Sequence, residues 1–166
     1  MQYASLADLQ KELYALKAKG KKVVFTNGVF DILHIGHVRY LEQAKQLGDF
    51  LIVGINDDAS VKRLQKGPER PIHDEIARAG VIAALRCADA SIIFSEDTPA
   101  MLIEAIQPDV LVKGGDYDAT ETDPTSRRYI VGSSETKARG GEVVCIPLIE
   151  GYSTTTAVNK IKTNGN

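Results

Sequence analysis

Short apolar runs alternate along the chain with longer stretches in which apolar residues recur at helical spacing. Five runs are typical of buried strands of a parallel sheet, because each is short, rich in aliphatic residues and followed by turn-forming residues. They cover residues 23–25, 50–55, 91–94, 108–113 and 142–146. The pattern predicts a Rossmann-like α/β fold, a doubly wound five-stranded parallel sheet in the order 3-2-1-4-5 with helices on both faces.

A further apolar stripe precedes the first strand. Four leucines between residues 6 and 16 share one helix face, Ser5-Leu-Ala-Asp8 resembles a capping box, and Gly20 is placed to end the helix. We interpret residues 1–20 as an N-terminal scaffold helix. The 166 residues predict a single domain, 1–166, because a chain of this length buries roughly two thirds of its unfolded surface in one core.

Composition narrows the classes of function. The 20 basic and 22 acidic residues give a formal net charge of −2, which argues against binding to nucleic acid or to a membrane surface, since both depend on a summed basic field. The two cysteines, Cys87 and Cys145, lack paired spacing, and no secretory leader or long apolar run is evident. We therefore expect a cytoplasmic protein with two inert thiols.

The stretch 25–40 carries the most informative chemistry. A predicted strand gives way there to a helix, at the carboxyl edge of the sheet, where ligands bind in open α/β folds and a helix N-terminus attracts phosphate. His34 and His37 could donate hydrogen bonds to a pentacoordinate phosphorus, and Gly36 would let a triphosphate approach the backbone. The alternatives are a surface histidine pair and a zinc site, for which His73 and Asp31 are only loosely eligible third ligands.

Polar residues also follow the other predicted strands. If the sheet is parallel, they converge on the histidines. They are Lys62, Arg63 and Lys66, then Lys113 and Asp116, and finally Ser153, Thr154 and Thr155. Such a set is rich in phosphate-directed donors and lacks a nucleophile paired with a base, which points to phosphoryl or nucleotidyl transfer rather than acyl transfer.

The segment Gly28-Val-Phe-Asp-Ile-Leu-His-Ile-Gly-His37 resembles the signature of the HxGH nucleotidyltransferases, the cytidylyltransferase-like family. The resemblance extends over residues 22–162. Within the family, the segments 26–31, 112–117 and 151–155 are most similar to the heptose 1-phosphate adenylyltransferases. In many bacteria that activity is the second half of a bifunctional kinase and adenylyltransferase, and this chain has no sugar-kinase half.

The resemblance implies roles for individual residues. His34 and His37 would stabilise the transition state at the α-phosphate of ATP, and Lys66, with Lys62 or Arg63 as helpers, would match the family's mobile lysine. The implied nucleotide-binding residues are Thr26, Asn27, Gly28, Phe30, Asp31, Gly36, Arg78, Asp116, Ser153, Thr154 and Thr155. The implied substrate-binding residues are Lys113, Gly114, Gly115 and Tyr117.

Several of these residues also have a purely structural interpretation. The lysine loop could be solvated, Arg78 could lie on the surface, Asp116 could form a turn, and Ser153 or Thr154 could cap the last helix. Asp31 either orders its loop through backbone N–H groups or approaches a metal ion. The implied cofactor is Mg²⁺, held by the phosphates of ATP or with help from Asp31 or Asp116.

The implied reaction is attack by a sugar 1-phosphate on the α-phosphorus of Mg²⁺-bound ATP, giving ADP-heptose and pyrophosphate. The resemblance also implies a homodimer, coupled in function to a separate sugar kinase. The rivals are a cytidylyltransferase acting on a polyol or amino-alcohol phosphate and a noncatalytic nucleotide-binding module. Leu148 and Ile149 weaken the first rival, because glycerol-phosphate cytidylyltransferases carry an arginine there. The stretch 118–131 contacts either an acidic substrate or a second subunit, and the sequence does not decide between them.

Overall fold

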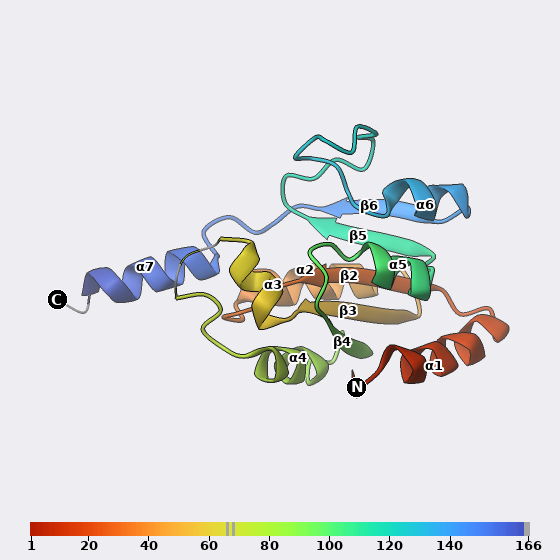
Figure 1. Ribbon diagram of the computed structural model, residues 1–166, viewed down its shortest axis with the longest axis horizontal. Coiled ribbons are helices and arrows are strands. Elements are labelled where there is room, and N and C mark those ends of the chain that lie inside the picture. The colour runs from red at the N-terminus through yellow and green to blue at the C-terminus, as the bar shows by residue number, and fades with distance from the viewer. Residues whose placement is uncertain (66, 68, 165–166) are drawn as a thin grey trace.

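A computed structural model describes residues 1–65, 67 and 69–164 of the chain. Its strands form one parallel sheet in the order β1-β4-β3-β2-β5-β6 (Figure 1). The strands are β1 (Gln2–Tyr3), β2 (Val23–Gly28), β3 (Phe50–Asn56), β4 (Ala90–Phe94), β5 (Val110–Gly114) and β6 (Glu142–Ile146). The helices are α1 (Leu6–Ala18), α2 (Ile35–Lys45), α3 (Asp58–Arg63), α4 (Glu75–Ala83), α5 (Ala100–Ile106), α6 (Ser133–Ala138) and α7 (Thr154–Asn164).

The predicted number of strands is wrong, because the sheet has six strands among the described residues rather than five. The additional strand, β1, is two residues long and pairs with β4 through Gln2 opposite Ser91 and Tyr3 opposite Ile92. A strand this short leaves no alternating or continuous apolar pattern. The order of the five predicted strands and their parallel direction are confirmed.

Helices cover both faces of the sheet, as a doubly wound fold requires. Alternate residues of the central strands point to opposite sides, so that Val24 packs with α2 and α4, whereas Val23 and Phe25 pack with α1 and α5. Figure 1 shows α5 in front of the sheet and α2 behind it. The two clusters of buried side chains are therefore separated by the sheet, and both contribute to one core.

Capping side chains fix where several helices begin. The Ser5 hydroxyl accepts a hydrogen bond from Asp8 N at 3.2 Å, which confirms the predicted start of α1. Asp57 and Asp74 cap α3 and α4 in the same way. Ser153 accepts from Thr156 N at 3.0 Å at the start of α7. Among the described residues, no helix combines the length and apolar character needed to cross a bilayer.

The parallel arrangement places the carboxyl ends of the strands at one edge of the sheet. In Figure 1, α3 and the start of α7 lie at this edge, and α7 extends away from the rest of the molecule. The loops that follow β2, β3, β5 and β6 all begin here. Polar residues from distant parts of the sequence are therefore brought close together at this edge.

Candidate active site

The two histidines of the HxGH segment form a stacked pair at the start of α2. His34 is the N-cap residue, with extended backbone (φ −140°, ψ 169°) and no capping hydrogen bond from its side chain. Its ring lies 3.8 Å from that of His37, centroid to centroid, at an interplanar angle of 20°. Phe30 meets the His37 ring edge-on, with 5.3 Å between centroids. The pair is thus held by ring packing, and its capping position leaves it beside the free N–H groups of the helix.

Burial keeps both imidazoles neutral near physiological pH. It lowers the pKa of His34, and burial together with the neighbouring His34 lowers the pKa of His37 to about 4. Nδ1 of each ring is buried and has no hydrogen-bond partner among the described residues, which leaves Nε2 as the nitrogen that a ligand can reach. A neutral ring that carries its proton on Nε2 can donate one hydrogen bond to an anionic oxygen.

Gly36 makes room for this arrangement. A Cβ at this position would lie 3.0 Å from both Cε1 and Nδ1 of His34, and 3.5 Å from Cβ of Tyr152. The sequence suggested that Gly36 admits a triphosphate to the backbone. In the structure, the nearest group that an added methyl would meet is the His34 ring.

A cavity of about 240 Å³ opens beside the histidine pair. Ser153, Thr154 and Thr155 line it from the N-terminus of α7. Thr154 Oγ1 also donates a 3.3 Å hydrogen bond to Ile32 O, which ties α7 to the loop before α2. The predicted convergence of the histidines with these hydroxyls is therefore found. The remaining lining residues are Val29, Phe30, Asp31, Gly36, Arg70, Leu148, Ile149 and Tyr152.

A second cavity of about 430 Å³ adjoins the first. Predicted site residues on its wall are Asn27, Gly28, Phe30, Lys113, Gly114 and Tyr117. Lys113 Nζ donates to Asn27 Oδ1 at 2.5 Å and lies 5.5 Å from the centroid of the Tyr117 ring. His37 lines both cavities, as do Val29, Phe30 and Leu148. His37 therefore stands where the two cavities meet, and His34, stacked on it, lines the smaller one.

Thr26 lies beneath the larger cavity instead of lining it. Thr26 is fully buried, and its hydroxyl lies 2.6 Å from the hydroxyl of Tyr40, a residue that lines the cavity. Burial raises the pKa of Tyr40 well above its usual value. The Thr26 and Tyr40 hydroxyls therefore form a hydrogen bond between neutral groups at the base of the cavity.

Asp31 orders the loops around the smaller cavity. Its side chain is buried, and it accepts hydrogen bonds from Arg70 Nε at 2.5 Å, His73 N at 2.9 Å and Ile72 N at 2.9 Å. Burial alone would raise the pKa of this carboxyl, but the two backbone N–H groups and the guanidinium outweigh it and hold the pKa below its ordinary value. Of the two roles left open by the sequence, the structure shows loop ordering through backbone N–H groups.

Arg78 does not line either cavity, contrary to the expectation that it contacts the nucleotide. It is 1% exposed. Its guanidinium donates to His73 O at 2.9 Å, to Val29 O at 2.7 Å and to Asp58 Oδ1 at 2.7 Å. All three partners are protein groups, so Arg78 ties the loop after β2 to α3 and to the residue before the N-cap of α4.

Other predicted residues also lie away from the two cavities. Asp116 is exposed and, like Gly115 and Lys62, is absent from both cavity walls. Arg63 donates to the Asp97 carboxylate and, at 2.7 Å, to Ser95 O. Lys66 lies outside the described residues, so its predicted catalytic role stays a prediction.

The described residues do not form a protein site for Mg²⁺. Among them, no group of three or more His, Cys, Asp or Glu side chains gathers as metal ligands would. Asp31 is engaged by the guanidinium and by backbone N–H groups, and Asp116 faces solvent.

Several residues that line the cavities were not expected from the sequence. Arg70 falls in a loop punctuated by glycine and proline, and only its position next to Pro71 hinted at a fixed conformation. Tyr40 fits the apolar pattern of α2, which gives no sign that it lines a cavity. Tyr129 and Val131 line the larger cavity from the stretch 118–131, whose role was left open. In this structure that stretch contributes to the cavity wall.

Comparison with known proteins finds relatives that match most of this chain. The Bifunctional protein HldE of Geotalea uraniireducens is 52% identical over 149 residues, and that of Nitrobacter hamburgensis is 53% identical over 156 residues. These matches cover 90% and 94% of this chain, but the chain spans only 29% and 30% of those proteins.

Solved structures are also similar to this chain. The lipopolysaccharide core biosynthesis protein from Thermoplasma volcanium is 30% identical with a TM-score of 0.60, over 81% of this chain and 100% of that one. Pantoate-beta-alanine ligase from Francisella tularensis shares the fold, with a TM-score of 0.60 over 98% of this chain and 78% of that one. Its sequence is 14% identical. A family model described as cytidylyltransferase-like matches residues 25–159. The chain belongs to the cytidylyltransferase-like family of nucleotidyltransferases.

Proposed function

We propose that this protein transfers the AMP moiety of ATP to a sugar 1-phosphate, giving ADP-heptose and pyrophosphate. The observation that carries the proposal is the neutral histidine pair at the junction of two adjoining cavities. A reaction between two phosphorylated substrates needs two binding spaces that meet at the reacting phosphorus. The histidines stand at that meeting point.

The smaller cavity suits the phosphates of ATP. It combines two imidazoles, the hydroxyls of Ser153 to Thr155 and the N-terminus of α7. Hydroxyls and free backbone N–H groups at a helix start are general phosphate ligands. The larger cavity would take the acceptor, with Lys113 as its phosphate-directed cation.

The chemistry follows from this placement. An oxygen of the sugar phosphate attacks the α-phosphorus in line, a new P–O bond forms, and the α–β bridging bond breaks with its electron pair leaving on pyrophosphate. The acceptor oxygen is already anionic, so no general base is needed. His34 and His37 would donate from Nε2 to the nonbridging oxygens, where charge develops in the transition state. Magnesium would enter as MgATP, as part of the substrate.

The names of the relatives favour a sugar acceptor. They are called bifunctional proteins, and the Thermoplasma protein is called a lipopolysaccharide core biosynthesis protein. This chain spans under a third of the bifunctional relatives. We propose that a sugar kinase activity supplies the sugar 1-phosphate.

The family description supports a second candidate, transfer of CMP from CTP to a polyol or amino-alcohol phosphate. One feature of the site disfavours it. Leu148 lines both cavities and Ile149 lines the smaller one, where the resemblance to glycerol-phosphate cytidylyltransferases would require an arginine. The apolar side chains remove a cation that such enzymes place in the site.

The test is a matrix of substrates. Purified protein is incubated with MgATP or MgCTP against heptose 1-phosphate, glucose 1-phosphate and glycerol 3-phosphate, and pyrophosphate release is measured. We expect release with MgATP and heptose 1-phosphate. His34→Ala should lower kcat about a hundred- to a thousandfold, the typical cost of one such donor. His73→Ala is the matched control, because the third histidine is exposed and its side chain lines neither cavity.

Two outcomes would contradict the proposal. Release with CTP and glycerol 3-phosphate alone would favour the cytidylyltransferase. Binding of ATP by calorimetry without pyrophosphate release from any pair would favour a noncatalytic nucleotide-binding module.

A further inference from the structure

The smaller cavity contains one fixed positive charge among its described lining residues. Arg70 supplies it, since the other lining side chains are apolar, hydroxylic, acidic or imidazole. Burial keeps the two imidazoles neutral near physiological pH. A triphosphate bound there carries several negative charges, so Arg70 is the group that can offset them.

Arg70 is held in place by the loop geometry around it. Its side chain is 8% exposed, and Nε donates to Asp31 Oδ2 at 2.5 Å. Asp31 is itself fixed by the backbone N–H groups of Ile72 and His73. The side-chain entropy of this long residue has therefore been lost before any ligand binds, which is the condition for a preorganised anion site.

Only one edge of the guanidinium is used by this contact. The group has five N–H donors, and the hydrogen bond found among the described residues comes from Nε. Neither terminal amino group is among the buried unpaired atoms of the described residues, and Arg70 lines the smaller cavity. A purely structural arginine would use this fork on protein acceptors, as Arg78 does with three of them.

We propose that the terminal amino groups of Arg70 bind the β- and γ-phosphates of ATP, and that Asp31 is the positioning residue that aims them. The inference rests on the proposed nucleotidyl transfer and extends it to the leaving group. When the α–β bond breaks, the electron pair and the new negative charge go to pyrophosphate. A planar guanidinium fork matches phosphate oxygens in a bidentate manner and stays charged throughout.

The experiment separates the phosphates of ATP from its nucleoside. Isothermal titration calorimetry measures binding of α,β-methylene ATP and of pyrophosphate, and AMP is measured by displacement of the analogue. In Arg70→Gln, we expect affinity for the analogue and for pyrophosphate to fall roughly 10- to 100-fold, as for loss of charge-assisted hydrogen bonds. AMP affinity should stay close to that of the unaltered protein, because AMP lacks the β- and γ-phosphates.

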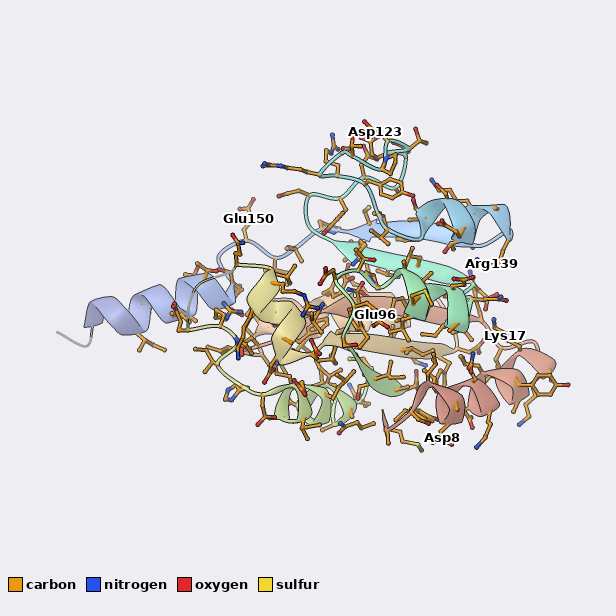
Figure 2. All side chains as sticks on the ribbon, viewed as in Figure 1. Asp8, Lys17, Glu96, Asp123, Arg139 and Glu150 are labelled. Carbon is orange, nitrogen blue, oxygen red and sulfur yellow. The ribbon has the colours of Figure 1, made fainter. Side chains whose placement is uncertain are left out.

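Arg139→Gln is the matched control for removal of one arginine charge. Arg139 is exposed at the end of α6, and Figure 2 shows it at the opposite side of the molecule from Glu150, which lies just before α7. Arg70→Lys keeps the charge and most of the side-chain stem but loses the fork. We expect it to fold as the unaltered protein does and to bind pyrophosphate about tenfold more weakly.

Three outcomes overturn the inference. Equal losses for AMP and for the analogue would mean that Arg70 only supports the site. Unchanged pyrophosphate affinity in both Arg70 variants would mean that it does not touch the leaving group. Failure of the unaltered protein to bind either the analogue or pyrophosphate would overturn the proposed nucleotidyl transfer itself, and this inference with it.

Discussion

Replacing Gly36 by alanine adds a single methyl group beside the stacked histidine pair. The new Cβ would lie 3.0 Å from two atoms of the His34 ring, closer than an ordinary van der Waals contact. The ring cannot move freely away, because it is stacked 3.8 Å from His37, which is packed in turn against Phe30. The substitution should therefore displace His34 by a few tenths of an ångström, a small part of the ~1 Å misplacement that can cost a hundredfold in rate.

The substitution should affect the rate much more than the stability. Gly36 lies inside α2 and its φ is not in the left-handed region, so alanine favours the helix by roughly 0.5–1 kcal/mol. The close contact offsets part of that gain, and the net free energy of unfolding should change by less than about 1 kcal/mol. The displaced imidazole should nevertheless lower kcat about tenfold, since its donor no longer meets the phosphate oxygen at the right distance.

Steady-state pyrophosphate release and urea denaturation measure the two quantities. Gly80→Ala is the matched control, because Gly80 is also inside a helix, α4, and a Cβ there would meet nothing nearer than Gln2 Oε1 at 3.8 Å. It should gain stability and keep its kcat. Full activity in Gly36→Ala would refute the argument that the His34 ring is held in place for catalysis.

Two further substitutions and one titration test the supporting structure. Asp31→Asn should lower the free energy of unfolding by about 3 kcal/mol, since it leaves the buried Arg70 without its anion. Because the pKa of Asp31 is lowered on folding, its stabilising effect is present above its unfolded pKa of about 3.9 and disappears as pH falls through the folded pKa. As the pH is lowered, the free energy of unfolding measured by urea denaturation should therefore fall more steeply in the unaltered protein than in Asp31→Asn.

NMR titration of His37 should give a pKa of about 4. The unfolded chain therefore protonates first, and the free energy of unfolding should fall as the pH drops from about 6.5. A measured pKa near 6.5 would contradict the buried neutral ring. Arg78→Leu should lower the free energy of unfolding by about 3 kcal/mol, because one buried and two partly buried acceptors lose their donor. Unchanged thermal unfolding would contradict its role as an anchor.

Much of the site could be predicted because the rule behind it is topological. Parallel strands bring their carboxyl ends to one edge, so the convergence of His34 with the hydroxyls near residue 154 follows from strand order alone. The N-cap positions of Ser5 and Ser153 were likewise visible in the sequence, since capping depends on local spacing. These features depend on contacts that are short in sequence or fixed by the fold class.

Other features depend on the path of irregular loops, which no periodicity records. The contact of Arg70 with Asp31 joins residues 39 positions apart, and Arg78 finds a carbonyl at Val29 whose direction is set by the loop after β2. Tyr40 satisfies the helical apolar pattern, yet its hydroxyl pairs with Thr26 across the core. β1 owes its pairing to its neighbour β4, since two residues carry too little pattern of their own. Tertiary partners, rather than local propensity, decide each of these cases.

The central claim is that a neutral imidazole pair meets the α-phosphate of ATP where the two cavities join. A crystal structure with α,β-methylene ATP and Mg²⁺ tests it most directly. We expect nonbridging α-phosphate oxygens within about 3.2 Å of Nε2 of both His34 and His37, with the β- and γ-phosphates in the smaller cavity. An analogue bound with its α-phosphorus out of reach of both rings would contradict it.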